Sequence, residues 1–199
     1  MIRGDSSEYE LLTKWCQTLP FFEDPKSVTT CEVGVREGMG SHLIINEIKS
    51  RIGKADYTHD AIDPYGDLEY QHFDNHPRWK RDGKWTSVAP KYPNEMRDNM
   101  IKDFATNPHF KFYNMTDIQY MDLFYYAKKV YDLVFLDGPH TTKSILREAL
   151  WFAERSRKGS RIIVDDYSLC NYSVIRAAIS YWDFKDIDKG KHKVCFERI

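Results

Sequence analysis

The sequence lacks several features that would point to a particular class of protein. Its four cysteines, Cys16, Cys31, Cys170 and Cys195, are scattered and form no C-x-x-C pair. Neither a disulfide framework nor a cysteine zinc site is therefore indicated. No apolar stretch approaches the roughly 20 residues of a membrane span, and residues 1–10 lack the apolar core of a signal peptide. We therefore expect a cytoplasmic protein with reduced thiols and no membrane segment.

An excess of charge of one sign is also missing. The chain has 29 Lys and Arg against 30 Asp and Glu, a formal net charge of −1, so nothing favours nucleic acid as a partner. Internal repeats and low-complexity tracts are absent. A chain of 199 residues with 42% hydrophobic content suffices for one domain with its own core. We expect a single domain over residues 1–199, and the sequence leaves formation of a homo-oligomer open.

The apolar pattern alternates between short strands and amphipathic helices, which predicts an α/β fold. Strands are predicted over 27–35, 56–62, 110–113, 131–136, 162–164, 184–187 and 194–198. Helices are predicted over 42–52, 94–104, 118–129, 141–158 and 174–182. The expected architecture is a doubly wound, Rossmann-like, mostly parallel sheet of seven strands with an antiparallel C-terminal hairpin. A helical cover at about 6–20 precedes it, and an aromatic-rich insertion at about 65–93 interrupts it.

A glycine-rich turn follows the first predicted strand, where residues 31–41 are CEVGVREGMGS. Glycines at such a turn permit the close approach of backbone that a bound cofactor requires. The nicotinamide fingerprint G-x-G-x-x-G does not fit, because three other residues separate Gly34 from Gly38. A phosphate-binding loop is excluded because the chain contains no G-K-[ST].

Acidic residues follow the two most apolar runs of the chain. Val134-Phe135-Leu136 leads into Asp137, and Ile162-Ile163-Val164 leads into Asp165 and Asp166. A right-handed crossover would place both strand ends at one edge of the sheet, where ligands of such folds bind. Clustered carboxylates repel unless protons or a cation compensate, and a hard divalent ion such as Mg²⁺ prefers oxygen ligands. Plain turns after the two strands are the alternative interpretation.

A further acid, Asp63, ends the strand predicted over 56–62, directly before Pro64. Its two acceptor oxygens suit the vicinal diol of a ribose, and a simple turn before proline is the alternative.

The insertion contains His72 and His76, whose spacing would let both face one metal on a helix. No third ligand is evident, so we predict surface histidines. The insertion also contains Trp79, Trp85 and Tyr92, which either form a lid over a substrate or only anchor the segment.

Around the glycine-rich turn the sequence resembles the class I S-adenosylmethionine-dependent methyltransferases, whose first motif is an acid, one residue and then alternate glycines. Arg36 stands where the middle glycine is usual. That variant resembles the small-molecule O-methyltransferases related to macrocin O-methyltransferase and the cephalosporin-hydroxylase-like enzymes. The resemblance implies that this loop holds the cofactor through Glu32, Gly34, Gly38, Gly40 and Ser41.

The same resemblance assigns the remaining site residues. Asp63 would bind the ribose hydroxyls, and Thr116 and Asp117, after the strand over 110–113, would hold the adenine. In the metal-dependent members, including catechol O-methyltransferase, acids after the fourth and fifth strands hold the ion. By that resemblance the Mg²⁺ ligands are Asp137, Asp165 and Asp166.

The sequence therefore predicts a Mg²⁺-dependent O-methyltransferase that acts on a small hydroxylated molecule such as a sugar or secondary metabolite. His140 lies near enough to Asp137 to take the hydroxyl proton as general base. Asp137 counts in this hypothesis as a catalytic residue and cofactor contact as well as a metal ligand. Two alternatives stay open: a metal-free methyltransferase whose acids hold a substrate amine, and a non-catalytic S-adenosylmethionine-binding or regulatory protein.

Overall fold

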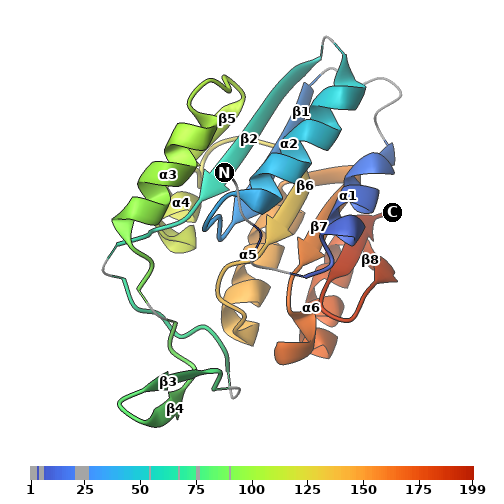
Figure 1. The fold of residues 1–199 in the computed structure, drawn as a ribbon. Helices are drawn as coiled ribbons and strands as arrows, with labels where there is room; N and C mark the ends of the chain where they lie inside the picture. The colour runs from blue at the N-terminus through green and yellow to red at the C-terminus, as the bar shows by residue number, and fades with distance from the viewer. Residues whose placement is uncertain are drawn as a thin grey trace.

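A sheet of seven strands runs through the middle of the protein (Figure 1). The computed structural model describes Gly4 and residues 7–20, 27–53, 55–66, 68–74, 77–89 and 91–199. The strand order is β5-β2-β1-β6-β7-β9-β8. The strands are β1 (Ser27–Val33), β2 (Asp56–Ile62), β5 (Phe110–Tyr113), β6 (Tyr131–Leu136), β7 (Ser156–Val164), β8 (Phe184–Lys189) and β9 (Val194–Arg198). Five of them pair in parallel, while β9 is antiparallel to β7 and β8, which confirms the predicted fold class.

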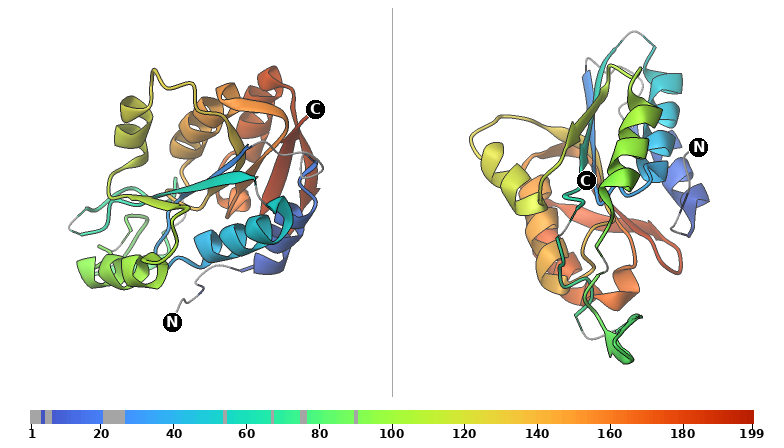
Figure 2. Two further views of the ribbon diagram at one scale, coloured as in Figure 1. Left: turned by 90° about the horizontal axis from the view of Figure 1, so that it is seen from above. Right: turned by 60° about the vertical axis from the view of Figure 1, so that its left-hand side comes forward.

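Helices cover both faces of this sheet (Figure 2). One face carries α1 (Tyr9–Gln17), α2 (Met39–Ile52) and α3 (Asn94–Phe104), and the other carries α4 (Asp117–Leu123), α5 (Thr142–Glu154) and α6 (Tyr172–Ile179). Two apolar clusters fill the two layers, one built on α1, α2 and α3 and the other mainly on α5 and α6. Burial of these faces supplies most of the driving force for folding. Among the described residues, no helix is long and apolar enough to cross a membrane.

Two predicted helices end earlier than the sequence pattern indicated. The helix predicted over 118–129 ends at Leu123 in α4, and the one predicted over 141–158 ends at Glu154 in α5. In the second case the helix ends because the chain joins the sheet at Ser156, which pairs with Tyr131 and begins β7. Both overestimates arise because helix ends depend on tertiary contacts that periodicity does not record.

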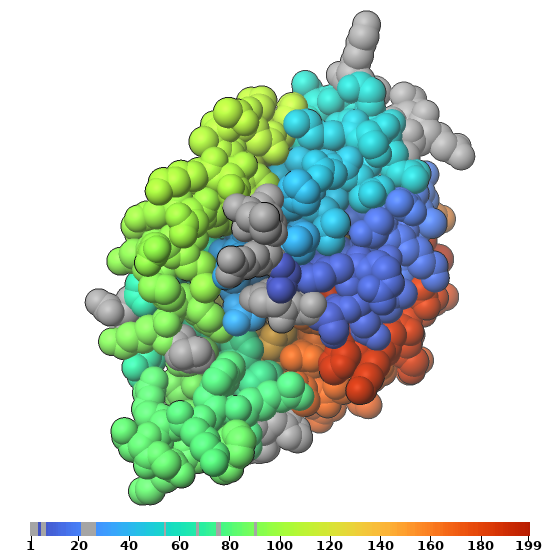
Figure 3. Space-filling view, viewed as in Figure 1, coloured from blue at the N-terminus to red at the C-terminus, as the bar shows by residue number. Residues whose placement is uncertain are grey.

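The aromatic-rich insertion forms a small hairpin that protrudes from the rest of the molecule (Figure 3). Its strands are β3 (Trp79–Arg81) and β4 (Lys84–Thr86). Asp82 and Gly83 between them have φ values of 49° and 75°, the left-handed conformation that tight hairpin turns require. The sequence analysis had not identified this hairpin among the described residues of the insertion.

A buried arginine joins the end of α1 to strands β7 and β9 of the sheet. Arg161 on β7 is 5% exposed, and its guanidinium donates to the carbonyl oxygens of Trp15 and Thr18 at 2.6 and 2.8 Å. The same group forms a two-pronged contact with Glu197 on β9, with N–O distances of 2.9 and 2.7 Å. One side chain thus provides hydrogen-bond donors for the last carbonyl groups of α1 and for a carboxylate on the neighbouring strand.

Replacing this arginine should destabilise the fold. We expect Arg161→Met to lower the free energy of unfolding by about 3–5 kcal/mol, because Glu197 and the two carbonyls lose their partner. Urea denaturation monitored by circular dichroism measures the change. Lys49→Met, at an exposed lysine on α2, is the control and should change stability by less than about 0.5 kcal/mol. Equal stability of both variants would contradict this account of Arg161.

Candidate active site

The carboxyl ends of four parallel strands meet at one edge of the sheet, as the sequence predicted. The hydrogen-bond ladder continues one residue beyond the strands: Gly34 N donates to Ile62 O at 2.9 Å, Asp137 N to Val33 O at 2.8 Å and Asp165 N to Leu136 O at 3.0 Å. The residues that follow β1, β6 and β7 therefore lie next to one another. Ligands of open α/β sheets bind at this edge.

The glycine-rich turn between β1 and α2 is shaped by close backbone contact. Gly34 has a φ of 87°, and a Cβ added there would lie 2.2 Å from the carbonyl oxygen of Asp137. Only glycine fits, because the turn after β1 packs directly on the turn after β6. Gly38, with a φ of 86°, precedes the first residue of α2. Arg36 also adopts a left-handed conformation, with a φ of 48°.

Asp63 holds that turn from the end of β2. Its Oδ2 accepts hydrogen bonds from the backbone N–H groups of Val35 and Arg36 at 2.9 and 3.0 Å, and its Oδ1 accepts one from Tyr65 at 3.2 Å. Burial raises the pKa of Asp63 above its usual value, and the three N–H donors act in the opposite direction. The carboxyl group therefore fixes the left-handed backbone at Arg36.

A small pocket of about 80 Å³ lies in front of the turn. Four of the residues assigned to the cofactor line it together: Gly34, Asp63, Thr116 and Asp117. Thr116 caps α4 by accepting a hydrogen bond from Gln119 N, and Asp117 forms an ion pair with Arg147 of α5.

Three more of the residues assigned to the cofactor, Glu32, Gly40 and Ser41, lie beneath the turn beside a chain of buried polar contacts. Ser41 Oγ donates to Glu32 and lies 2.8 Å from His59 Nε2. His59 Nδ1 lies 2.8 Å from Thr30 Oγ1, which lies 2.9 Å from the hydroxyl of Tyr57. A Cβ added at Gly40 would lie 1.9 Å from a carboxylate oxygen of Glu32. The contacts of Glu32, Gly40 and Ser41 seen here are with the protein, and a direct contact with a cofactor stays a prediction.

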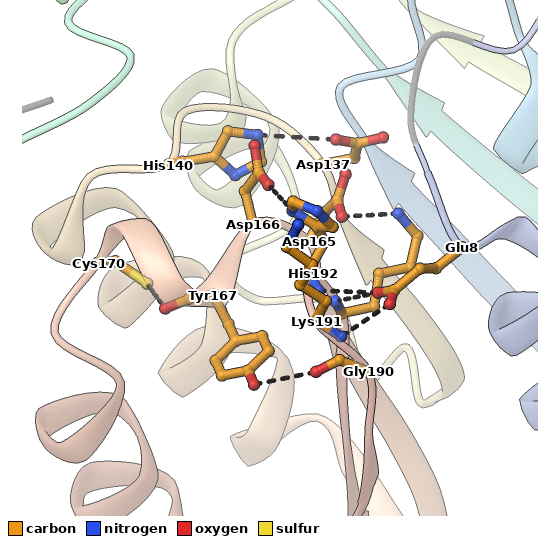
Figure 4. A network of polar contacts seen from close by, with 11 residues as sticks. Glu8, Asp137, His140, Asp165, Asp166, Tyr167, Cys170, Gly190, Lys191 and His192 are labelled. Atoms are coloured by element: carbon orange, nitrogen blue, oxygen red, sulfur yellow. Dashed lines mark hydrogen bonds and ion pairs between the residues drawn. The ribbon is translucent and has the colours of Figure 1, made fainter. Parts of the chain in front are cut away.

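Three further acids and a histidine gather beside Gly34, at the ends of β6 and β7 (Figure 4). Asp137, His140 and Asp165 each offer one ligand atom within 4.8 Å of the others. Asp166 adopts a left-handed conformation, with a φ of 44°. Its Oδ1 lies 3.0 Å from His192 Nδ1 in the turn between β8 and β9. The structure thus brings Asp137, His140 and Asp165 together and directs Asp166 toward His192.

The two central carboxyl groups have opposite electrostatic states. Burial, followed by the charge of Asp165, raises the pKa of Asp137 well above its usual value. Burial alone would raise the pKa of Asp165 too, but the Lys193 ammonium and a hydrogen bond from Asp137 hold the pKa of Asp165 below its usual range. Lys193 Nζ lies 2.6 Å from Asp165 Oδ1, and Lys193 is fully buried. The surroundings therefore favour a protonated Asp137 beside a charged Asp165 that pairs with Lys193.

This arrangement does not fit the Mg²⁺ ion predicted from the sequence. An ion bound to Asp165 Oδ1 at about 2.1 Å would lie within about 4.7 Å of the Lys193 ammonium. At an effective dielectric constant of about 20, the repulsion is about 7 kcal/mol. Asp137 would also have to lose its proton, and Asp166 would have to leave His192. We therefore derive no chemical step through a metal.

The insertion packs over His140. The ring of Phe73 is stacked on that of His140, with centroids 5.8 Å apart, and His72 meets it edge-on at 4.6 Å. Burial lowers the pKa of His140, so its imidazole is neutral at neutral pH. Among the described residues His140 Nδ1 has no hydrogen-bond partner, and Nε2 lies 3.7 Å from Asp137 Oδ1. A neutral buried histidine whose Nδ1 has no hydrogen-bond partner among the described residues can accept a proton.

The prediction that His72 lies on the surface was wrong. His72 is 8% exposed, and burial lowers its pKa to about 2. The reason is that the insertion folds back onto the strand ends, so His72 packs against His140 and Trp79. His76 lies outside the described residues. Sequence analysis also missed Lys193, whose only signal was its place directly before an apolar strand.

The buried chain beneath the turn predicts a pH dependence of stability. Burial, followed by the charge of Lys129, lowers the pKa of His59 to about 3. The unfolded chain therefore binds one more proton than the folded protein between about pH 6.5 and pH 3, and stability is lost as pH falls through that range. Between pH 7 and pH 5 the wild type should lose about 2 kcal/mol more than His59→Gln, measured by urea denaturation. His42→Gln on α2 is the control, and equal losses in all three proteins would contradict the assignment.

Comparison with known proteins identifies the family of the chain. A family model described as a methyltransferase domain matches residues 31–167, more than half of the chain. This segment runs from β1 through the paired acids after β7. No sequence among the curated proteins matches this chain.

Solved structures with the same fold include several methyltransferases. The O-methyltransferase NovP is 16% identical, with a TM-score of 0.61 over 95% of this chain and 78% of that chain. TomG from Streptomyces achromogenes, an O-methyltransferase solved in complex with S-adenosylmethionine, is 11% identical, with a TM-score of 0.58 over 99% and 82% of the two chains. A ribosomal protein L11 methylase from Lactobacillus delbrueckii subsp. bulgaricus is 12% identical, with a TM-score of 0.56 over 98% and 80%. These similarities show the fold alone.

Proposed function

This chain belongs to the methyltransferase family whose model spans residues 31–167, and we propose that it transfers a methyl group from S-adenosylmethionine to a hydroxyl oxygen of a small molecule. The observation that carries the proposal is the contact between two half-sites. A pocket lined by Gly34 and Asp63 adjoins an acidic cluster containing a buried, neutral His140. The backbone contact between Gly34 and Asp137 joins the two.

The cofactor half of the site suits a nucleoside. The Asp63 carboxylate accepts three backbone hydrogen bonds and has room for another, which a ribose hydroxyl can donate. The pocket volume of about 80 Å³ is well below the roughly 300 Å³ of typical ligand sites. Leu68 and Tyr70 of the insertion form part of its wall. We expect these two side chains to move when the cofactor binds.

The acceptor half of the site suits proton removal from a hydroxyl group. S-adenosylmethionine supplies a methyl group on a positively charged sulfur, and the attacking oxygen must lose its proton. His140 takes that proton, and the negative charges of Asp165 and Asp166 favour the imidazolium that results. Phe73 stacks on both Trp79 and His140, with centroids 5.2 and 5.8 Å apart, so the surroundings of the proposed base are aromatic, which favours a ring-shaped acceptor such as a sugar or an aromatic metabolite. NovP and TomG, both named O-methyltransferases, support oxygen as the acceptor atom.

Calorimetry with S-adenosylmethionine tests the cofactor half. We expect the wild type to bind it and Asp63→Asn to bind about 10–100-fold more weakly, because a hydrogen bond to a charged acceptor is lost. Asp56→Asn, at the exposed opposite end of β2, is the matched control and should bind like the wild type. A wild type that binds no S-adenosylmethionine would overturn the proposed function.

Substitution of the proposed base tests the acceptor half. Against a panel of hydroxylated small molecules, we expect His140→Gln to lower turnover by about 10²–10⁴-fold while cofactor affinity stays unchanged. The readout is formation of S-adenosylhomocysteine, measured across pH. The wild-type rate should fall on acidification as His140 becomes protonated, and the residual rate of His140→Gln should lack that limb. A variant with full turnover at neutral pH would exclude His140 as the base.

A further inference from the structure

A buried lysine lies where the sequence led us to expect a metal ion. Lys193 precedes β9, and its ammonium reaches the carboxyl end of β7 to contact Asp165. Lysine is rarely buried without a partner, since desolvation of the ammonium is costly. Here its Nζ lies 2.6 Å from Asp165 Oδ1, 5.3 Å from the centre of the Phe135 ring and 5.5 Å from that of Tyr9. The carboxylate and the two ring faces together form a cage for one cation.

The backbone around this lysine is held in place by a single carboxylate. Glu8, just before α1, accepts hydrogen bonds from the backbone N–H groups of Lys191, His192 and Lys193 at 2.7, 2.8 and 3.0 Å. Figure 4 shows Glu8 directed at this turn. Gly190 N also donates to Lys193 O at 2.8 Å. The ammonium is therefore preorganised, since its turn is fixed by contacts that are independent of Asp165.

The acids around Lys193 are arranged to pair with a positively charged side chain of the protein itself. Asp165 accepts from the ammonium, and Asp137 forms a hydrogen bond with Asp165 rather than presenting a second free carboxylate. A divalent ion bound among Asp137, His140 and Asp165 would face the buried lysine at short range, where solvent screens the repulsion only weakly. The donor set has the geometry of a metal site, but a buried lysine already pairs with one of its carboxylates.

We propose that the Lys193 ammonium is the resident cation of the acidic cluster, and that it orients Asp165 and Asp137 for the acceptor while it excludes divalent metal ions. This inference deepens the proposed function, since it makes the methyl transfer independent of metal. Lys193 acts as a positioning residue through Asp165. The resulting site differs from the Mg²⁺ site predicted from the sequence because it contains the buried Lys193 and because Asp166 is directed at His192.

Titration with Mn²⁺, followed by electron paramagnetic resonance of the free ion, tests the proposal without cofactor or acceptor. At about 1 mM Mn²⁺ we expect no stoichiometric binding to the wild type. Lys193→Met and Lys193→Gln should each bind one ion, with an affinity at least about 100-fold above that of the wild type, because the repulsion is gone. Asp165→Asn added to Lys193→Met should abolish that site. Lys191→Met, on the same turn and exposed, is the matched control and should bind none.

Two results would overturn the proposal. One is stoichiometric Mn²⁺ binding by the wild type that Asp165→Asn removes. The other is a folded Lys193→Gln or Lys193→Met variant that binds Mn²⁺ no better than the wild type. The wild-type titration is decisive even if both variants fail to fold. Failure of the proposed function would appear separately, as a wild type that gives no calorimetric signal with S-adenosylmethionine.

Discussion

The structure depends above all on how the protein accommodates buried negative charge at one edge of its sheet. Among the acids there, Asp63, Asp137 and Asp165 are each stabilised in a different way. Asp63 accepts three backbone N–H bonds, Asp137 has a raised pKa that favours its neutral form, and Asp165 pairs with the Lys193 ammonium. A buried carboxylate without such a partner would be strongly destabilising. The electrostatics of this edge therefore select the backbone shape of the turn after β1 and the position of the turn before β9.

The contacts that stabilise these acids also form the two halves of one site. The N–H groups that stabilise Asp63 belong to the turn that lines the pocket. The same hydrogen bonds therefore stabilise the buried carboxylate and fix the shape of the pocket. The turn then packs on the backbone of Asp137 so closely that Gly34 cannot carry a side chain. A change at either turn is transmitted to the other through this contact, because close-packed backbone has no room to relax.

The insertion between β2 and α3 completes both halves. Leu68 and Tyr70 form a wall of the pocket, while His72 and Phe73 pack on His140. Burial lowers the pKa of His140, and this segment contributes to that burial, since desolvation disfavours the imidazolium. One segment outside the central sheet thus influences both the space for a nucleoside and the protonation state of the proposed base.

The sequence by itself determined the α/β alternation, the antiparallel finish and the placement of acids at strand ends, because each is a local pattern of period or position. It also identified four residues that line one pocket: Gly34, Asp63, Thr116 and Asp117. Only the tertiary structure decided where α4 and α5 end, that His72 is buried, and that Lys193 meets Asp165 across 28 residues of chain. Those outcomes depend on which distant segments pack together, and the net charge of a buried cluster depends on every side chain that reaches it.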